Sequence, residues 1–550
     1  AIPAAGLLHD ESALAPVLND MPSGGTDLGG NQIVIEGLGF FPAGQVHVLW
    51  GALSLGPAQL VSVAPDRIEL VAPPGSGTVV VRVQTPNGLS NARTYAYSPN
   101  GPVPISFAIA SEVPFEKGPT VGAFGPDGRY YAGLIDGRIA AVEFDDAWNV
   151  VSKVHYPGVS GLPNPNVLGI AFDPFDPYSG PGDTVRVLVA HGQHFVNGGT
   201  SFVGPSPYTG QVSALFGPAF DAPVPLLTGL PTSNHDHAVN ALEFDHEGDL
   251  LVLVGSNTNA GVAHPNSGDL PESPLSAALL RAETSRPDFQ GAVQYVLSEG
   301  GAPSADQVQG EQVDVAPGAH VSVYAAGLRN AFDIVLHTNG RLYATDNGPN
   351  VGYGGASTGP DTEGPDPFAQ DELLLVEPGR YYGAANRNRG RHDPRENAWR
   401  SSAEATEPGV YAGPIAILPS STNGLAEYRS AVFGGQLRGD LVVQKWANTA
   451  RRIDLSPDGR KVLSVQPIGP WTGGLSLEFG SGGALLVTDY GNKRTKVLVP
   501  NDVTPPALRV LDVTPWRGLA AGGQRFVLAG VGFGTLANTT VTFGGLPASL

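Results

Sequence analysis

The sequence predicts an all-β protein in which a six-bladed β-propeller follows one β-sandwich and precedes the beginning of another. Short apolar strands alternate with turn residues along most of the 550 residues. A strand–turn–strand unit recurs six times in the middle of the chain, which is typical of a repeat architecture. Helical periodicity is scarce, and SPLSAALLRAETS, near residue 280, is one of few stretches that favour a helix.

Composition agrees with this fold class and excludes several functions. The 74 Gly and 50 Pro residues are spread between β-rich runs, which suits many turns better than disorder. A net charge of −20 argues against nucleic acid or an anionic membrane as partners. The absence of cysteine excludes disulfides, thiolate catalysis and cysteine-ligated metals. No apolar run reaches the roughly 18 residues of a membrane span.

Residues 14–98 form the first predicted unit, because about seven short strands in under 100 residues indicate a sandwich. Residues 507–550 begin on the same frame: a proline, then Gly-Gly, then a β-run, then G-x-G-F. This frame resembles the IPT/TIG family of immunoglobulin-like domains, which implies an immunoglobulin-like sandwich and possible protein partners. The second copy matches only the first half of such a domain, so we expect the full protein to continue beyond Leu550.

Residues 103–500 hold the six repeated units, and each unit would supply the inner strands of a four-stranded blade. The units begin near residues 121, 167, 239, 332, 431 and 474. Two long inserts, residues 192–236 and 349–425, are expected to be loops on one face of the propeller. Loops gathered on a rigid scaffold are the usual place for a site.

The stretch YAAGLRNAFDIVLHTNGRLYATDNGPN, residues 324–350, carries residues that a plain hairpin does not need. Arg329 and Asn330 precede its first strand, and Gly348 and Pro349 follow its second. With SNHDHAVNALEFDHEGDLLVLVG and DELLLVEPGRYYG, it resembles the soluble quinoprotein sugar dehydrogenases and the sorbosone-dehydrogenase-like and Hedgehog-interacting-protein-like propellers. These motifs span most of residues 110–500.

The resemblance implies a role for each of these residues. In the family, pyrroloquinoline quinone (PQQ) lies over the top of the propeller, and a histidine at the position of His237 takes the proton of a sugar hydroxyl. Arg329 would lie beside the quinone oxygens, and Asn330 would be a neighbouring cofactor contact. The carbonyls of Gly348 and Pro349 would bind a calcium ion, which prefers oxygen ligands.

Three departures from the family pattern concern the cofactor. Asn164 stands where the family has a glutamine, and Lys445 is one position from an expected lysine, with Trp446 in its place. The segment GPWTGGLSLEF lacks the arginine pair that grips the quinone carboxylates, and burying unpaired carboxylates is costly. Three loop arginines could substitute: Arg387, Arg389 and Arg391.

Simpler interpretations remain open for each motif. His237 could be a structural histidine, or the triplet of His235, Asp236 and His237 could be part of a metal site. Arg329 and Asn330 could tie one blade to its neighbour, and Gly348 and Pro349 could form only a turn.

Two classes of function therefore remain open, and whether the protein is an enzyme depends on them. The first is a quinoprotein that oxidises an aldose-type sugar with PQQ and calcium. The second is a catalytically silent propeller that serves adhesion, carbohydrate binding or extracellular assembly. The chain begins at Ala1 without Met, which fits either trimming or removal of a signal peptide. With the terminal domains, this favours a secreted or cell-surface location.

Overall fold

The computed structural model describes most of the chain. The described residues are 15–27, 29, 32–98, 105–178, 180–194, 208–233, 235–270, 272–297, 299–302, 313–353, 357–359, 362–363, 369–384, 412–447, 449–501, 508–534, 538–543 and 546–549. Over these residues the protein is all-β, as predicted, and its only helices are short 3₁₀ turns. The 3₁₀ turns are η2 (Ala43–Gln45), η3 (Pro57–Gln59), η5 (Pro265–Ser267), η7 (Val432–Gly435) and η8 (Ser481–Gly483). Within the same residues, no helix is long and apolar enough to cross a membrane.

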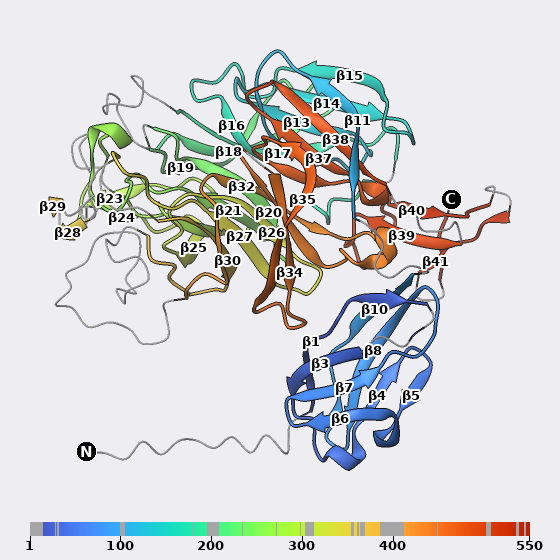
Figure 1. The fold of residues 1–550 in the computed structure, drawn as a ribbon. Coiled ribbons are helices and arrows are strands. Elements are labelled where there is room, and N and C mark those ends of the chain that lie inside the picture. The colour runs from blue at the N-terminus through green and yellow to red at the C-terminus, as the bar shows by residue number, and fades with distance from the viewer. Residues whose placement is uncertain are drawn as a thin grey trace, which may run out of the picture.

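The N-terminal unit is a sandwich of two sheets (Figure 1). One sheet has the order β1 (Val17–Asp20), β3 (Gln32–Leu38), β7 (Arg67–Val71), β6 (Leu60–Ala64). The other has the order β2 (Gly24–Thr26), β10 (Arg93–Ser98), β8 (Thr78–Thr85), β4 (His47–Trp50), β5 (Leu53–Leu55), with β9 (Gly88–Leu89) beside β8. Apolar side chains from both sheets, Ile35 and Trp50 among them, alternate inward to form one core.

Six four-stranded antiparallel sheets follow within the described residues. In order from the inside outwards, the first sheet is β12 (Pro119–Phe124), β13 (Tyr130–Leu134), β14 (Ile139–Phe144), β15 (Val150–Tyr156), and the second is β16 (Asn166–Ala171), β17 (Arg186–Gly192), β18 (Gly210–Phe216), β19 (Val224–Leu230). The third sheet is β20 (Val239–Phe244), β21 (Leu250–Val254), β22 (Ala278–Ala282), β25 (Val321–Ala326). The fourth sheet is β26 (Ala331–Leu336), β27 (Leu342–Asp346), β30 (Asp371–Val376), β31 (Ala416–Leu418). The last two are β32 (Thr422–Tyr428), β33 (Asp440–Lys445), β34 (Thr449–Leu455), β35 (Val462–Thr472); and β36 (Leu477–Phe479), β37 (Leu485–Asp489), β38 (Arg494–Pro500), β11 (Phe107–Pro114). Two small hairpins lie outside the blades: β23 (Tyr295–Leu297) with β24 (Val313–Val315), and β28 (Ser357–Gly359) with β29 (Thr362–Glu363).

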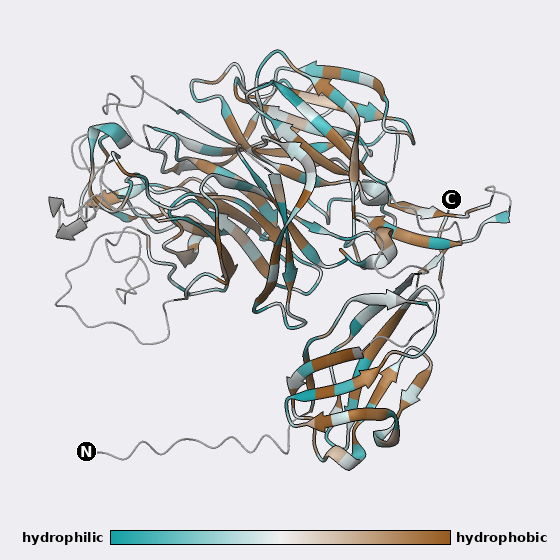
Figure 2. Ribbon diagram, viewed as in Figure 1, coloured by the Kyte–Doolittle hydropathy of each residue, from teal (hydrophilic) through white to brown (hydrophobic). Residues whose placement is uncertain are grey.

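The six sheets close into a ring. Each innermost strand contacts the innermost strands of the two neighbouring sheets, and β36 of the sixth sheet contacts β12 of the first. Six separate apolar clusters fill the six spaces between neighbouring sheets. The sixth sheet takes its outermost strand, β11, from the chain before the first sheet, so the two ends of the propeller are hydrogen-bonded to each other. Figure 2 shows apolar colouring along the propeller strands.

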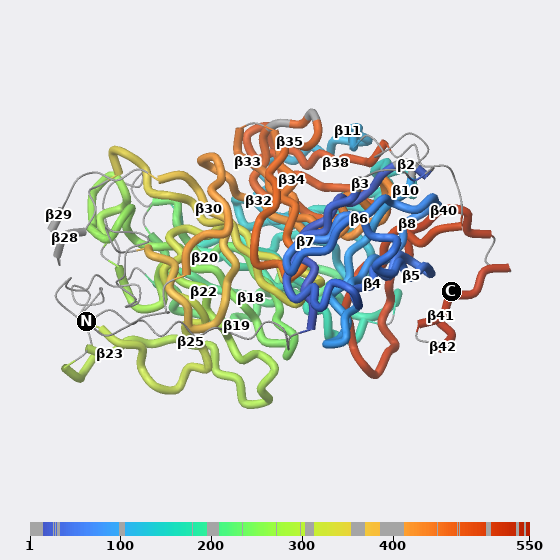
Figure 3. The backbone as a smooth tube through the Cα atoms, turned by 60° about the horizontal axis from the view of Figure 1, so that its bottom comes forward, coloured from blue at the N-terminus to red at the C-terminus, as the bar shows by residue number. Residues whose placement is uncertain are grey.

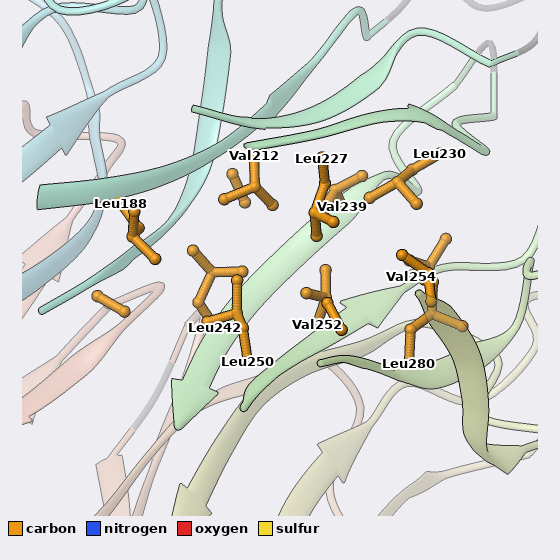
Figure 4. Close-up of a cluster of buried hydrophobic side chains, with 14 of the residues drawn as sticks. Leu188, Val212, Leu227, Leu230, Val239, Leu242, Leu250, Val252, Val254 and Leu280 are labelled. Carbon is orange, nitrogen blue, oxygen red and sulfur yellow. The ribbon is translucent and has the colours of Figure 1, made fainter. Parts of the chain in front are cut away.

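Continuous apolar strands arise because each blade is covered on both faces. In β21, Leu250, Val252 and Val254 pack toward the second blade, whereas Leu251 and Leu253 pack toward the fourth. Figure 4 shows the first set meeting Leu188 and Val212 of the second blade. The helix expected near residue 280 was wrong for this reason, because Ala278–Ala282 is the third strand of a blade and its side chains alternate between both neighbours.

Two other expectations require correction. The fifth repeat does not begin at residue 431, because its inner strand is β32 and the segment at Val432–Gly435 is a 3₁₀ turn that leads to β33. The inserts 192–236 and 349–425 are not loops alone. They contain the outer strands of the second and fourth blades, and the second insert also reaches into β32.

The central channel has two ends, which we call the front and rear mouths. The six innermost strands begin at the front mouth and end at the rear mouth. Because second strands run antiparallel to innermost strands, the residues that follow β27, β33 and β37 also lie at the front mouth. Residues of the third, fourth, fifth and sixth blades can therefore meet there.

The remaining segments lie at the edges of the propeller. The sandwich meets the fifth blade, where the Thr78 hydroxyl donates to the Gly434 carbonyl at 2.9 Å and Arg93 donates to the Leu455 carbonyl at 3.0 Å. After β38 the chain forms the hairpin β39 (Arg509–Thr514) and β40 (Val527–Val531) and the short pair β41 (Thr542–Phe543) and β42 (Leu546–Pro547). Figure 3 shows the blue sandwich strands and the red C-terminal strands on the same side of the propeller.

Candidate functional site at the front mouth

His237 precedes β20 and is 7% exposed. Its Nδ1 lies 2.9 Å from the carbonyl oxygen of Ser256. A carbonyl oxygen only accepts, so Nδ1 carries the proton and Nε2 keeps its lone pair. Burial, followed by the nearby guanidinium of Arg329, lowers the pKa of His237 to about 4. The side chain is therefore neutral at pH 7, with Nε2 able to accept a proton.

The neighbours of His237 are hydrogen-bonded to each other. The Nδ1 of His235 lies 2.6 Å from Oδ1 of Asp236, whereas Nε2 of His237 lies 3.8 Å from the same oxygen, too far for a hydrogen bond. Partial desolvation opposes ionisation of the half-exposed Asp236, but the hydrogen bond from His235 and the nearby charge of Arg329 hold its pKa below the usual range. The described residues contain no group of three or more His, Asp or Glu that could hold a metal.

Arg329 lies between the third and fourth blades and is 4% exposed. Its guanidinium donates to the carbonyl and side-chain oxygens of Asn259 at 2.7 and 2.8 Å, and to the Asn347 carbonyl at 3.3 Å. Its backbone N–H donates to the carboxylate of Asp346 at 3.0 Å. The guanidinium is thus held rigidly by the protein, and its charge acts on His237 at short range.

Asn330 is a hydrogen-bonded link between blades. Its side-chain oxygen accepts from Asn240 at 3.0 Å, and its amide nitrogen donates to Asn347 at 3.3 Å. A Cβ at Gly255 would come within 3 Å of both Asn330 and His237, so only glycine allows the two side chains this close to the third blade. These contacts agree with the interpretation in which Asn330 ties neighbouring blades together.

Gly348 and Pro349 follow β27 at the same mouth. The N–H of Gly348 donates to Asp371 at 3.1 Å, and the carbonyl of Pro349 accepts from the N–H of Ala369 at 3.4 Å. Asp371 also accepts from the side chain of Asn347 at 2.8 Å and from the N–H of Thr422 at 2.7 Å. The turn is therefore fixed by a carboxylate that spans the fourth and fifth blades.

The other predicted site residues lie further round the mouth. Asn164 precedes β16, and its carbonyl oxygen accepts from Nδ1 of the buried His191 at 2.7 Å. Lys445 ends β33 and pairs with Thr422 on the neighbouring strand. Arg387, Arg389 and Arg391 lie outside the described residues. The structure brings His237, Arg329 and Asn330 together, and it connects them to Gly348 through Asn347 and Asp371.

The segment that should carry the family's arginine pair is built differently here. Trp471 is 2% exposed, donates to the side chain of Gln444 at 2.7 Å and packs in the core between the fifth and sixth blades. A Cβ at Gly474 would collide with Val487 and Gln444, and Gly473 has φ +74°, which disfavours a side chain. The backbone at this point has no room for an arginine at Gly474.

The fit of the implied cofactor is consequently partial. Neutral His237, the fixed charge of Arg329 and the carbonyl oxygens of Gly348 and Pro349 are chemically suited to a quinone and a calcium ion, and the Pro349 carbonyl already accepts from the N–H of Ala369. Around Gly473 and Gly474 the described residues offer no cation for the quinone carboxylates. The described residues around Gly473 and Gly474 do not fit the acidic end of PQQ.

Sequence reasoning missed several residues of this network. Asp346 and Asn347 stand in the motif that contains Gly348 and Pro349, and Asp371 begins the acidic pair of DELLLV. The sequence feature that could have identified them is a polar residue at the end of a buried strand. Asn259 lies in a loop between β21 and β22, and no pattern marks it as a partner of Arg329.

Several solved structures resemble the chain. An oxidoreductase described as glucose dehydrogenase from Thermus thermophilus is 20% identical, with a TM-score of 0.45, covering 72% of this chain and 100% of its own. The soluble aldose sugar dehydrogenase of Escherichia coli is 16% identical, with a TM-score of 0.44 and the same coverages. The PQQ domain of pyranose dehydrogenase from Coprinopsis cinerea is 13% identical, with a TM-score of 0.41, covering 72% and 98%. Similarities of this size say nothing about ligand or activity.

Sequence comparison gives two further results. No curated protein sequence matches the chain. Residues 226–468 match the family model described as Glucose / Sorbosone dehydrogenase, and they run from the end of the second blade to the last strand of the fifth. The propeller therefore contains a region similar to the glucose/sorbosone dehydrogenases.

Proposed function

We propose that the front mouth binds an aldose-type sugar and that the protein oxidises one of its hydroxyl groups. His237 accepts the hydroxyl proton at Nε2, and Arg329 stabilises the negative charge that develops beside it. PQQ, with calcium at the carbonyls of Gly348 and Pro349, is the cofactor class that the family match suggests, and it would accept the two electrons.

One observation carries this proposal. The Nδ1–H of His237 is fixed by the Ser256 carbonyl, so the unprotonated nitrogen is the one remote from that contact. The buried His191 also has its Nδ1 against a carbonyl oxygen, that of Asn164, but its Nε2 is already bonded to the Ser213 hydroxyl and no guanidinium contributes to its lowered pKa. A general base needs this tautomer and this protonation state.

A second candidate is a propeller that binds a sugar without oxidising it, in adhesion or extracellular assembly. The lack of space for cations at Gly473 and Gly474 favours this candidate, because the quinone would bind weakly. The two candidates share sugar binding at the front mouth and differ in electron transfer.

The N-terminal sandwich and the C-terminal segment suggest where a protein of either kind would act. We propose that the N-terminal sandwich is an IPT/TIG-like domain that binds protein partners, and that residues 507–550 begin a second one. A secreted or cell-surface protein would use such domains to hold the propeller near its glycan or sugar.

A titration decides between the two candidates. PQQ is added to the purified protein in calcium buffer, quinone absorbance is followed, and an aldose and a dye are then added. Sugar-dependent dye reduction that disappears in His237→Asn supports the dehydrogenase. Sugar binding without dye reduction, at quinone concentrations where absorbance no longer changes, supports the silent propeller and contradicts oxidation.

A further inference from the structure

A pocket of about 440 Å³ lies beside the candidate site, where the fifth and sixth blades meet the front mouth. It is lined by Trp446, Ala447, Gly473, Gly474, Asp489, Tyr490, Gly491 and Asn492. Trp446 follows β33, and its backbone N–H donates to the carbonyl of Ser421, the residue before β32, at 2.8 Å. The next residue, Thr422, is hydrogen-bonded to Asp371 and Asn347, and Asn347 is in turn hydrogen-bonded to Arg329. A continuous chain of hydrogen bonds therefore connects this pocket to Arg329.

Two aromatic rings form one side of the pocket. The indole of Trp446 is 43% exposed, and its centroid lies 5.6 Å from that of Tyr490, with the planes at 42°. A Cβ at Gly118 would collide with the Tyr490 ring, so backbone of the first blade covers one side of that ring. The exposed aromatic surface thus belongs to a supported pair rather than to a loose side chain.

The rest of the lining is small and electrically neutral. Gly473, Gly474 and Gly491 contribute backbone without side chains, and Asn492 contributes an amide. Among the described residues of the lining, only Asp489 is charged; it is 4% exposed and pairs with Lys496 at 2.9 Å and Arg494 at 3.2 Å. Its contacts with these two cations offset its charge, and it also accepts from the side-chain amide of Asn492 at 3.0 and 2.9 Å.

This combination matches one ligand chemistry. A sugar ring presents polarised C–H groups on its faces, which the negative face of an aromatic ring attracts, and hydroxyls at its edge, which backbone and amide groups can bind. An anionic ligand would find no described cation in the lining and would meet the field of a chain with net charge −20.

We propose that Trp446 and Tyr490 form the platform on which a neutral sugar ring stacks, and that this pocket discriminates against acidic ligands. The proposal rests on the proposed function only in placing sugar at the front mouth. The segment that lacks cations for the quinone carboxylates therefore lines a pocket whose aromatic rings can contact a neutral sugar ring.

The experiment measures binding by calorimetry on the full chain without quinone, so that no turnover occurs. The ligands are D-glucose and D-glucuronate, which differ in a carboxylate. The variants are Trp446→Ala, Trp446→Lys and the control Phe216→Ala, whose exposed ring ends β18 at the rear face. Thermal unfolding checks that each variant is folded.

Glucose is expected to bind more tightly than glucuronate. Trp446→Ala should weaken glucose binding about tenfold, Trp446→Lys should reverse the preference, and Phe216→Ala should change neither affinity. Equal binding of both ligands, or unchanged glucose binding in folded Trp446→Ala, overturns the platform. That result leaves the His237-dependent oxidation untouched, whereas loss of oxidation with a working platform overturns only the proposed function.

Discussion

At the scale of single residues, the protonation state of His237 follows from its surroundings. Burial and the fixed charge of Arg329 disfavour the imidazolium, and the Ser256 carbonyl selects which nitrogen is protonated. Arg329 in turn is oriented by Asn259 and Asn347, so the protonation state of His237 also depends on these two residues.

The first prediction concerns the pH dependence of His237. Its pKa of about 4 in the folded protein lies below the roughly 6.5 of an unfolded chain. As pH falls from about 6.5 to about 4, the unfolded state therefore binds a proton first, and stability decreases. We expect kcat/KM for sugar oxidation to show no break near pH 6.5 and to fall only toward pH 4. A break in kcat/KM near pH 6.5 would contradict this assignment.

At the scale of elements, the innermost strands carry carboxyl groups into the channel. Asp333 on β26, Glu478 on β36 and Glu243 on β20 line the same cavity near its rear mouth. Burial, with smaller contributions from repulsion by Glu243, raises the pKa of Asp333 and that of Glu478 to about 8. Both groups are thus protonated at pH 7.

The second prediction follows from this raised pKa. Below about 4.3 both folded and unfolded chains hold the Glu478 proton, but between about 4.3 and 8 only the folded chain does. Stability due to this group is therefore lost as pH rises to about 8. Glu478→Gln should lose less thermal stability than the wild type between pH 6 and pH 9. Parallel losses in both proteins would show that Glu478 does not titrate in this range.

The blades could be predicted from the sequence because each unit has two apolar strands joined by a polar turn, as in β26 and β27. The fifth unit was placed wrongly because VFGG is as apolar as a strand, whereas the true inner strand TNGLAEY mixes polar and apolar residues. The link between Asn259 and Arg329 joins residues 70 positions apart, and only the closed ring brings them together. Trp446 was noted only as a departure, because sequence does not show that it faces a pocket.

At the scale of the whole molecule, the C-terminal segment is part of the propeller's surface. Residues 514–517, at the end of β39, line the cavity at the rear mouth. Arg517 donates to Glu243 at 2.6 Å and to the Asp245 carbonyl at 3.1 Å, and Trp516 packs against the core between the third and fourth blades. Residues 514–517 therefore narrow the rear mouth, and we expect ligands to enter by the front.

The third prediction tests this covering role. Arg517→Ala should destabilise the propeller by about 1–3 kcal/mol, because Glu243 loses its charged partner in a partly buried site and keeps only its hydrogen bonds from the backbone N–H groups of Phe244 and Leu336. Arg525→Ala is the matched control, since its guanidinium bonds a carbonyl oxygen at an exposed position. Denaturant unfolding measures both variants. If the two variants are equally stable, residues 514–517 do not stabilise the propeller at its rear mouth.

The most direct test of the account is dye-linked oxidation of D-glucose by the wild type and by His237→Asn. Calcium is present, and PQQ is raised until the rate stops changing, which allows for weak binding of its carboxylates. We predict sugar-dependent dye reduction in the wild type and its loss in the variant, with both proteins equally folded. Equal rates in the two proteins, or no sugar-dependent reduction in the wild type at saturating quinone, would contradict the assignment of His237 as the base of a sugar dehydrogenase.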